Sequence, residues 1–388
     1  MIVHIITGLN SGGAEGVLYR LCAECHDSNH RHTVISLMDR GVYGDRLESL
    51  GVTLHCLCMP RGWITVKGIF RLYRLLRRHS SSVVQTWMYH ADLIGGVIAK
   101  LAGVKAVIWG IRGPLDLRET GFSTRSIARL CAWLSHFVPT RIVSNSNYAA
   151  RVHQDFGYKP ERFIVIPNGY PSDRPTPSAL ERQAARDELQ TNRGLPLLGM
   201  VARFDSYKDH NNLFEALGLL KSRSIPFCCV LVGAGMDNRN AVIQRQINEA
   251  GISDSLRLLG MRDNIPAVMN ALDVHILSSL GESFPNVIAE AMACGTPCVT
   301  TDVGDAALIV GDTGWVVPPR DPTALADAIA DAIGALSDKD QWARRRASAR
   351  LRIQEKFSVE TMCSAYRNLW NDAAGRDANR GPSAAGQG

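Results

Sequence analysis

Four charged side chains in the second half of the chain have types and spacing suited to a phosphorylated, hydroxyl-rich ligand. Arg203 and Lys208 lie five residues apart in RFDSYKD, directly after an apolar stretch. Arg offers a planar fork for phosphate oxygens, and Lys offers a compact point charge. Glu282 and Glu290 lie eight residues apart within residues 281–298, GESFPNVIAEAMACGTPC. Carboxylates accept hydrogen bonds, and sugar or ribose hydroxyls are neutral donors that would suit them beside a phosphate.

The stretch 281–298 is predicted to be a loop followed by one helix. Apolar strands are predicted on either side of it, at residues 273–277 and 297–301. Pro285 suits a first helical position, because its missing N–H would be unpaired there in any case. A strand that leads into a helix start presents free backbone N–H groups and a positive dipole end, and both favour a bound phosphate.

Other candidate residues also follow predicted strands, and each has an ordinary structural alternative. Gly12 and Gly13 would let the backbone approach a ligand, or they form a plain strand–helix turn. His90, in WMYHAD, would contact a sugar hydroxyl or the reacting centre, or it is a structural histidine; Arg112 has similar alternatives. Arg262 lies in a loop that would hold a nucleotide base by its backbone, or it lies in a solvated turn.

The elements that position these residues alternate between apolar strands and helices. This alternation predicts parallel sheets with helices on both faces. Residues 171–196 are rich in proline and charge and predict a linker with one short helix. We therefore expect an α/β protein of two Rossmann-like, doubly wound domains, at residues 1–170 and 197–355, that face each other across a cleft. Residues 373–388 have too few apolar side chains to pack and are expected to be disordered.

Composition narrows the class of protein. A hydrophobic content of 46% and a mean hydropathy of -0.05 indicate a soluble globular protein, and its net charge of +6 is modest. The ten cysteines are scattered, and even the C-x-x-C of Cys22 and Cys25 is expected to hold reduced core thiols. The start, MIVHIITG, lacks the basic region of a signal peptide, and no apolar run reaches transmembrane length. These features predict a cytoplasmic protein.

Several kinds of site lack their sequence signatures. The only D-x-D, at residues 338–340, lies in a polar connection, so a metal-bridged diphosphate is not expected and no essential metal is predicted. A Walker loop, a zinc cluster and a G-x-S-x-G motif are also missing. Basic residues without interleaved aromatic residues argue against a nucleic-acid partner.

A basic amphipathic helix is predicted at residues 64–79, which begin at Ile64 and end at His79. Its basic residues are Lys67, Arg71, Arg74, Arg77 and Arg78. Such a helix can make a peripheral contact with an anionic membrane. The alternative is a surface helix that packs on the sheet and leaves its basic face in water.

Taken in order, five motifs resemble those of retaining glycosyltransferases of family 4, which have the GT-B fold. They are SGGAE, WMYH, VIPNG, VARFDSYKD and GESFPNVIAEAMACGTPCV, and the resemblance runs from Ile2 to Trp370. It implies a metal-independent enzyme without a cofactor that transfers a hexose or N-acetylhexosamine from a UDP- or GDP-linked sugar. WMYH and WGIR are similar to motifs of bacterial surface-polysaccharide enzymes, which implies a lipid-linked or oligosaccharide acceptor at the inner membrane face.

The resemblance also implies roles for individual residues. Arg203 and Lys208 would grip the donor diphosphate and stabilise the leaving group. Glu282 would hold hydroxyls of the donor sugar, and Glu290 would hold those of the ribose. His90 would contact the donor sugar near its anomeric carbon.

Further positions are implied to surround the donor. Gly12 and Gly13 would let the first domain close on the diphosphate. In this fold the last helix, at residues 356–372, crosses back to the first domain. The remaining implied donor-binding residues are Arg262, near the base, and Phe284, Pro285, Asn286 and Val287 at the helix start.

The implied mechanism is front-face attack with retained configuration, in which the leaving phosphate helps to deprotonate the acceptor. Neither signature carboxylate is clearly a nucleophile, because both are accounted for by hydroxyl binding. The alternatives are an epimerase or phosphorylase of the same fold and a catalytically inactive nucleotide-sugar-binding scaffold. An epimerase would need acids beside the sugar ring, a phosphorylase would need a lysine bearing pyridoxal phosphate, and a scaffold would be expected to have lost some of the four charged residues.

Overall fold

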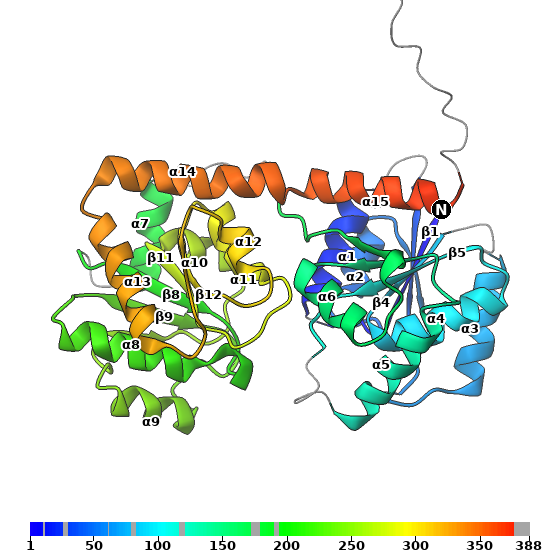
Figure 1. Cartoon of the computed structure of the whole chain (residues 1–388), viewed down its shortest axis with the longest axis horizontal. Coiled ribbons are helices and arrows are strands. Elements are labelled where there is room, and N and C mark those ends of the chain that lie inside the picture. Colours follow the sequence, from blue (N-terminus) through cyan, green and yellow to red (C-terminus); the bar gives the residue numbers. More distant parts are fainter. Residues whose placement is uncertain are drawn as a thin grey trace, which may run out of the picture. The chain divides into compact units, whose positions relative to one another are not determined.

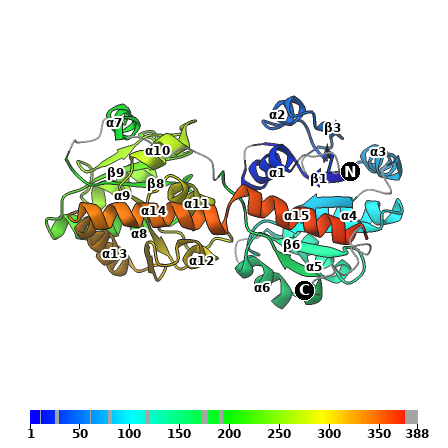
Figure 2. The same ribbon diagram turned by 90° about the horizontal axis from the view of Figure 1, so that it is seen from above.

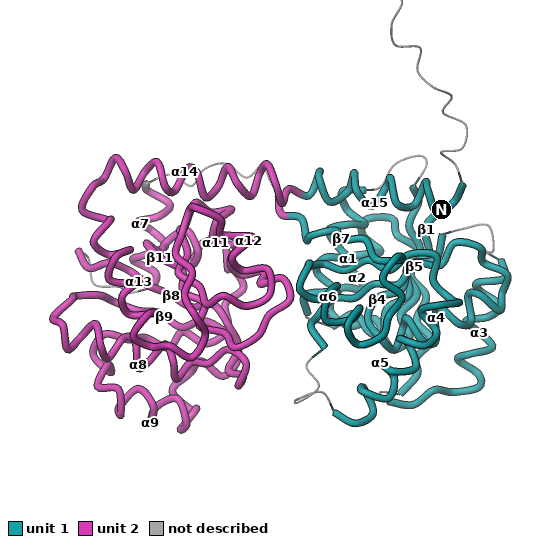
Figure 3. The backbone as a smooth tube through the Cα atoms, in the orientation of Figure 1, with its two compact units in different colours: residues 1–169, 359–388 teal, residues 170–358 magenta. Residues whose placement is uncertain are grey.

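The computed structural model of the chain describes residues 1–10, 12–25, 30–60, 62–78, 83–115, 121–171, 179–189 and 194–375. They form two compact units (Figure 3). Unit 1 comprises Met1–Gly169 and Val359–Gly388, and unit 2 comprises Tyr170–Ser358. Each unit contains one parallel sheet with helices on both faces, which confirms the predicted pair of Rossmann-like domains.

The sheet of unit 1 has seven strands in the order β3-β2-β1-β4-β5-β6-β7, and its pairings are parallel. The strand order reverses between β1 and β4, which pair so that Ile6 lies opposite Trp87. The central strands are buried along their length because both faces are covered. The strands are β1 (Ile2–Ile6), β2 (His32–Ser36), β3 (Thr53–Cys56), β4 (Val83–Trp87), β5 (Ala106–Ile111), β6 (Arg141–Ser144) and β7 (Phe163–Val165).

Helices cover this sheet in two layers (Figures 1 and 2). One core contains buried residues of α3, α4, α5 and α6, and the other contains buried residues of α1, α2 and α15. The helices are α1 (Gly13–Glu24), α2 (Gly44–Ser49), α3 (Val66–Arg78), α4 (Tyr89–Leu101), α5 (Phe122–Leu134), α6 (Asn147–Asp155) and α15 (Val359–Ala373), with a 3-10 turn η1 (Pro160–Arg162).

The C-terminal helix α15 is an integral part of unit 1. Tyr366 and Trp370 are fully buried, and the indole N–H of Trp370 donates to Oε1 of Gln85 on β4 at 3.0 Å. A disulfide joins Cys363 to Cys25, at the end of α1, so the prediction that every cysteine is reduced is wrong for this pair. The two cysteines are 338 residues apart. Only the packing of α15 on α1 brings them together, and residue spacing gives no sign of that packing.

Buried histidines lie beneath α15. Nε2 of His4 and Nδ1 of His32 are 2.9 Å apart, and one ring nitrogen of each histidine and the Cys22 thiol all lie within 4.8 Å of one another, a spacing that could hold a metal ion. The indole N–H of Trp87 donates to Nδ1 of His4, so the proton of neutral His4 is assigned to Nε2, which donates to His32. Burial, followed by the nearby His32 and Arg112, lowers the pKa of His4. The hydrogen bonds from Trp87 to His4 and from His4 to His32 use nitrogen lone pairs that a metal would need. We therefore interpret this cluster as part of the core.

The sheet of unit 2 has six strands in the order β10-β9-β8-β11-β12-β13, again with parallel pairings. Its order reverses between β8 and β11. The strands are β8 (Leu197–Val201), β9 (Cys228–Val232), β10 (Leu256–Leu258), β11 (Val274–Leu277), β12 (Cys298–Thr301) and β13 (Trp315–Val317). The helices are α7 (Ala179–Glu188), α8 (His210–Ser222), α9 (Ala241–Glu249), α10 (Ile265–Ala271), α11 (Asn286–Ala293), α12 (Ala306–Val310), α13 (Pro322–Ala335) and α14 (Lys339–Lys356).

The segment predicted as a linker contributes a helix to unit 2. Arg182 and Arg186 of α7 each lie 2.6 Å from a carboxylate oxygen of Asp273, and they also donate to the carbonyls of Asn270 and Ala271. These contacts satisfy the open carbonyls at the end of α10. The helix predicted at residues 356–372 is α15, which begins at Val359, and residues 376–388 of the expected disordered tail lie outside the described residues.

Candidate functional site

The central charged residues of unit 2 follow the two strands at which its strand order reverses. Arg203 and Lys208 come after β8, and Glu282 comes after β11, the neighbour of β8. In open parallel sheets, ligands bind at the carboxyl ends of the strands at this reversal. The fold therefore places the sequence-predicted cations and a sequence-predicted carboxylate where a ligand site is expected.

Lys208 and Glu282 form the centre of this candidate site. Nζ of Lys208 donates to Oε1 of Glu282 at 2.5 Å, and the side chains are only 19% and 15% exposed. The hydroxyl of Ser279 donates to the same carboxylate oxygen at 2.9 Å. A phosphate would compete for the ammonium, and a sugar hydroxyl would compete for the carboxylate, so the pair presents both kinds of contact from one place.

Backbone contacts hold the two loops of the candidate site together. The hydroxyl of Ser278 donates to the carbonyl of Lys208 at 2.9 Å, and the N–H of Leu280 donates to the carbonyl of Tyr207 at 2.7 Å. Lys208 ends the 3-10 turn η2 (Ser206–Lys208). Asp209 then adopts a left-handed conformation with φ 45° and caps α8 by accepting from Asn212 N–H. These contacts fix the backbone of the loop on both sides of Lys208.

Arg203 has a different environment from Lys208. Its side chain is 69% exposed, and its guanidinium binds Oδ2 of Asp205 through Nε at 2.9 Å and Nη2 at 2.8 Å. Burial opposes ionisation of Asp205, but the N–H of Tyr207 and the Arg203 guanidinium lower its pKa overall. Asp205 holds Arg203 in place while leaving most of its guanidinium open to solvent.

The start of α11 differs from the prediction by one position. Pro285 is the residue that precedes the helix, with φ −70° and ψ 94°, and Asn286 is the first helical residue. Phe284 is only 4% exposed and packs between the rings of Tyr170 and Phe357. Its side chain therefore belongs to the core, and the contribution left to this position in ligand binding is its backbone.

The rest of α11 carries the second carboxylate. Glu290 lies one turn into the helix and is partly exposed, as is Val287 in the first turn. Oδ1 of Asn286 accepts a hydrogen bond from the hydroxyl of Tyr170. The N-terminal end of α11 is the positive end of the helix dipole, where the sequence predicted an environment that favours anions.

Two glycines that the sequence analysis did not identify lie in close contact with the backbone of the site's loops. A Cβ on Gly304 would lie 2.5 Å from the carbonyl oxygens of both Glu282 and Ser283. A Cβ on Gly233 would lie 2.1 Å from the carbonyl oxygen of Ala202 and 3.0 Å from the nitrogen of Arg203. Both glycines also have positive φ, at 59° and 147°. The loops with Glu282 and Arg203 can take their positions only because these residues lack a side chain.

Gly304→Ala is expected to destabilise the protein by about 2–4 kcal/mol, because it adds a backbone clash to an unfavourable positive φ. Gly251→Ala is the matched control, since Gly251 also has a positive φ, of 66°, but has no atom within 4 Å of its Cβ position. That control is expected to lose only about 1 kcal/mol. Urea unfolding of the two variants measures the difference. Equal losses of unfolding free energy would show that the loop with Glu282 shifts to accommodate the added methyl group.

Two buried histidines lie in the electrostatic field of Lys208. Burial, followed by the charge of Lys208, lowers the pKa of His210 to about 4 and that of His275 to about 3. Both side chains are therefore neutral at physiological pH. The positive charge beside Glu282 thus comes from Lys208, without a contribution from these histidines.

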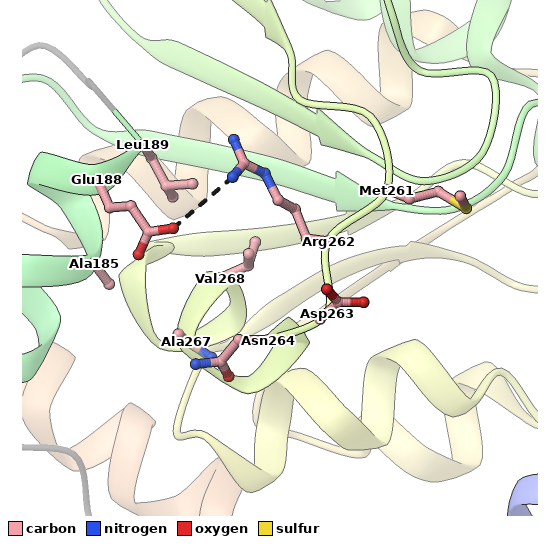
Figure 4. A pocket seen from close by; sticks show the side chains of 9 residues that line it. All are labelled: Ala185, Glu188, Leu189, Met261, Arg262, Asp263, Asn264, Ala267 and Val268. Atoms are coloured by element: carbon pink, nitrogen blue, oxygen red, sulfur yellow. Dashed lines mark hydrogen bonds and ion pairs between the residues drawn. The ribbon is translucent and has the colours of Figure 1, made fainter.

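Arg262 lines a pocket of about 300 Å³ between α7, α10 and the loop after β10 (Figure 4). Its guanidinium points toward α7, and its Nη1 lies 3.8 Å from Oε1 of Glu188. The N–H of Gly233 donates to the carbonyl of Gly260, so the loop after β10 is bound to the loop after β9. The side chain of Arg262 is engaged with α7, and a base would meet this loop through its backbone.

The candidate residues of unit 1 also follow the strands at its reversal. Gly12 and Gly13 come after β1, and His90 comes after β4. Gly12 precedes α1, and a Cβ there would lie 2.4 Å from a carboxylate oxygen of Glu15. Burial raises the pKa of the Glu15 carboxyl. The helix start that would face a phosphate is thus partly occupied by the chain's own acid.

His90 is held by an unusual backbone turn. Met88, directly before α4, has a φ of 70°, a conformation that side chains other than glycine rarely adopt. His90 is half-buried, and this burial lowers its pKa, so the imidazole is neutral at physiological pH. A neutral imidazole can hydrogen-bond a hydroxyl as donor or acceptor.

Arg112 has a structural role in unit 1. Its guanidinium stacks 4.2 Å above the ring of Trp87, donates to Oδ1 of Asn168 at 3.1 Å and binds the hydroxyl of Tyr366. These contacts join β4, the end of the first segment of unit 1 and α15. They favour the structural alternative for this residue.

Three kinds of site feature escaped the sequence-based prediction. Gly233 directly follows β9, which was an available signal, whereas Gly304 lies three positions past the end of β12. Ser279 follows β11 in the same loop as Glu282, so its position in a strand-end loop also marked it. The burial of His210 and His275 gave no signal, because His210 lies in the polar stretch KDHNN and a histidine in an apolar stretch, such as His275, is ordinarily core.

The D-x-D motif has a structural explanation. The carboxylate of Asp338 accepts a hydrogen bond from the N–H of Gln341 and caps α14, and Asp340 lies in the first turn of that helix. An acid at either position stabilises the helix start. Among the residues that the structure describes, no helix is both long and apolar enough to cross a membrane.

Both units match families of known proteins. A family model described as Glycosyltransferase Family 4 matches residues 11–174, and one described as Glycosyl transferases group 1 matches residues 195–334. The UDP-Gal:alpha-D-GlcNAc-diphosphoundecaprenol alpha-1,3-galactosyltransferase of Escherichia coli is 25% identical over 79% of each chain. A putative glycosyltransferase of Bacillus subtilis is 25% identical over 98% of each chain.

A solved structure has the same architecture. The Anabaena protein HepE, in complex with UDP, superposes with a TM-score of 0.83 over 96% of this chain and 99% of that one, at 20% identity. The two family models between them cover the candidate loops of both units, and the superposition extends over nearly the whole chain. The chain therefore belongs to the family 4 glycosyltransferases and has the GT-B fold.

Proposed function

We propose that this enzyme transfers a hexose or N-acetylhexosamine from a nucleotide-diphosphate sugar to a lipid-linked or oligosaccharide acceptor, with retention of configuration. The observation that carries the proposal is the ion pair of Lys208 and Glu282 at the reversal of the second sheet, beside Arg203. It combines a cation for a diphosphate with a carboxylate for sugar hydroxyls. The Escherichia coli relative is named for a UDP-linked donor, and the Anabaena protein was also solved with UDP-glucose, which supports a UDP sugar over a GDP sugar.

Each residue has a proposed task. Lys208 and Arg203 bind the donor diphosphate and stabilise the charge that grows on the leaving phosphate as the anomeric C–O bond breaks. Glu282 holds hydroxyls of the donor sugar, and Glu290 holds those of the ribose. The neutral imidazole of His90 hydrogen-bonds the sugar near the anomeric carbon.

The remaining proposed contacts are made by the backbone. The glycine turn after β1 approaches the diphosphate, the loop after β10 meets the base, and the start of α11 binds sugar or phosphate oxygens. Such fixed N–H groups stabilise negative charge without reorganising during the reaction. The residues of these three segments are Gly12 and Gly13; Arg262; and Phe284, Pro285, Asn286 and Val287.

Retention and metal independence are further parts of the proposal. Both Glu282 and Glu290 are assigned to hydroxyl binding, so the acceptor attacks from the face that the diphosphate leaves, and the leaving phosphate accepts the acceptor's proton. Lys208 and Arg203 neutralise the diphosphate, which removes the need for a divalent cation. The proposed setting is the inner membrane face, where the exposed basic face of α3, within residues 64–79, meets anionic lipid.

The test is a donor screen with the full chain and a prenyl-diphosphate-linked sugar as acceptor. UDP- and GDP-linked hexoses and N-acetylhexosamines are compared, and the anomeric coupling of the product is read by nuclear magnetic resonance. An α-linked donor is expected to give an α-linked product, with an unchanged rate in EDTA. A β-linked product would contradict retention, and loss of activity in EDTA would contradict metal independence. Epimerised donor without transfer would favour the epimerase, and binding without turnover would favour the scaffold.

A further inference from the structure

The outward side of α5 in unit 1 carries large apolar side chains among the polar Ser123, Ser126 and Arg129, although a surface helix normally exposes few such side chains. Ala128, Cys131 and Ala132 face the core, as expected for the buried stripe. On the opposite side, Phe122 is 85% exposed and Trp133 is 62% exposed. The same side also carries exposed Leu130 and, just past the helix, Phe137, whose ring lies 5.6 Å from that of Trp133. We call Phe122, Leu130, Trp133 and Phe137 the aromatic stripe.

The aromatic stripe belongs to a layer of three neighbouring helices. α4 packs against α3 on one side and α5 on the other, and all three contribute to the same core (Figure 1). α3 buries Leu72 and Leu76 and turns its basic side chains to solvent. Phe70 of α3 and Trp63 before it are 60% and 75% exposed, so apolar side chains also accompany the basic face.

Acidic residues are rare among the described residues of this layer. Between Glu48 and Asp155, the only acid among the described residues is Asp92, and it is fully buried. The exposed charges on the three helices are basic, and they are Lys67, Arg71, Arg74, Arg77, Arg78, Lys100 and Arg129. Exposed aromatic rings beside basic side chains match the headgroup region of an anionic bilayer, which takes up aromatic side chains and attracts Lys and Arg.

We propose that the aromatic stripe of α5 inserts into the headgroup region of an anionic bilayer, as a second anchor beside the basic face of α3. The inference extends the proposed function, because the bilayer would supply the lipid-linked acceptor. A second copy of this chain fits the surface less well, since a two-fold contact would bring the basic side chains of α3 against their own copies. Two anchors on neighbouring helices would also fix which side of unit 1 faces the lipid.

Sedimentation with vesicles tests the proposal on the full chain. Vesicles of phosphatidylcholine with phosphatidylglycerol are compared with phosphatidylcholine alone, at low and high salt. Trp133→Ser/Phe137→Ser is expected to weaken binding to the anionic vesicles by at least about tenfold, because two inserted rings are lost. The matched control, Leu180→Ser/Leu351→Ser, replaces apolar side chains of unit 2 that are 83% and 51% exposed, and it is expected to bind as the wild type does.

The outcomes separate this inference from the proposed function. Wild-type chain that does not prefer anionic vesicles, or a stripe variant that binds as tightly as wild type, would overturn the bilayer contact. A wild-type dimer in sedimentation velocity that the stripe variant converts to monomer would assign the stripe to a second copy instead. Thermal unfolding checks that the variants fold. The stripe variant is expected to bind UDP or GDP as tightly as wild type does in calorimetry. If wild type binds neither nucleotide, that result would count against the proposed donor site and not against the bilayer contact.

Discussion

Lys208→Ala is expected to lower kcat/KM for sugar transfer by a factor on the order of 10²–10³, the usual cost of removing one preorganised group that stabilises developing charge. Most of the loss should fall on kcat, because the charge on the leaving phosphate is largest in the transition state. Lys208 is 19% exposed, so its charge acts in a poorly solvated position where it is screened little. Steady-state kinetics with the donor found in the screen measures the effect.

Lys221→Ala is the matched control for Lys208→Ala. Lys221 also pairs with a carboxylate, that of Asp254 at 2.6 Å, but both partners are exposed and lie away from the reversal of the sheet. Its removal is expected to leave kcat/KM unchanged. Lys208→Ala strands Glu282 with only the Ser279 hydroxyl, so a loss of about 1–3 kcal/mol in unfolding free energy is also expected. A folded Lys208→Ala variant with kcat/KM within about twofold of wild type would remove Lys208 from catalysis.

Asp92→Asn is expected to remove a large pH dependence of stability. Asp92 is fully buried in the first turn of α4, and burial raises its pKa to about 8. Hydrogen bonds from Thr86 and the N–H of Gly110, and the charge of Arg112, oppose this rise. Its Oδ1 accepts from the Thr86 hydroxyl at 2.5 Å and from the Gly110 N–H at 3.2 Å, and an asparagine oxygen would retain both bonds.

The sign follows from proton binding. Between pH 4 and pH 8 the unfolded chain has released the Asp92 proton that the native protein still holds, so rising pH favours unfolding. From pH 5 to pH 8 the wild type should lose up to about 4 kcal/mol relative to Asp92→Asn. Buried His153, His210 and His275 have lowered pKa values and act in the opposite sense between pH 4 and 6.5, but they are common to both proteins and cancel.

Urea unfolding at pH 5, 6.5 and 8 measures this difference between wild type and Asp92→Asn. The two free energies of unfolding should diverge steadily as pH rises, with the variant more stable at pH 8. Parallel curves would show that the carboxyl is ionised in the native protein and stabilised by Arg112. The m-value at each pH checks that both proteins unfold as the same cooperative unit.

The predicted fold rested on local signals that tertiary structure preserved. Stretches rich in apolar side chains, such as residues 83–87 and 274–277, became β4 and β11, because strands buried on both faces need mostly apolar side chains. The strand order could not be predicted from such local signals. Sequence placed Lys208 and Glu282 after different strands, but only the observed pairing of β8 with β11 shows that these strands are neighbours.

What the sequence could not predict depends on contacts between distant segments. The resemblance implied that the last helix returns to the first domain, but it did not imply the contacts that the helix makes there, which include the Cys25–Cys363 disulfide and the hydrogen bond from Trp370 to Gln85 on β4. The assignment of α7 to unit 2 rests on ion pairs of Arg182 with Asp273, which are far apart in the chain. Gly304 supports the Glu282 loop through a close approach of backbone to backbone, which has no periodic signature.

Calorimetric titration with UDP and GDP tests the central claim most directly, since it needs neither the donor sugar nor the acceptor. Wild type is expected to bind one of the two nucleotides, with affinity falling at least about 100-fold in Arg203→Ala/Lys208→Ala, because two phosphate contacts are removed. Lys221→Ala is expected to bind as wild type does. Failure of wild type to bind either nucleotide, or unchanged affinity in the folded double variant, would contradict a diphosphate site at the reversal of the second sheet.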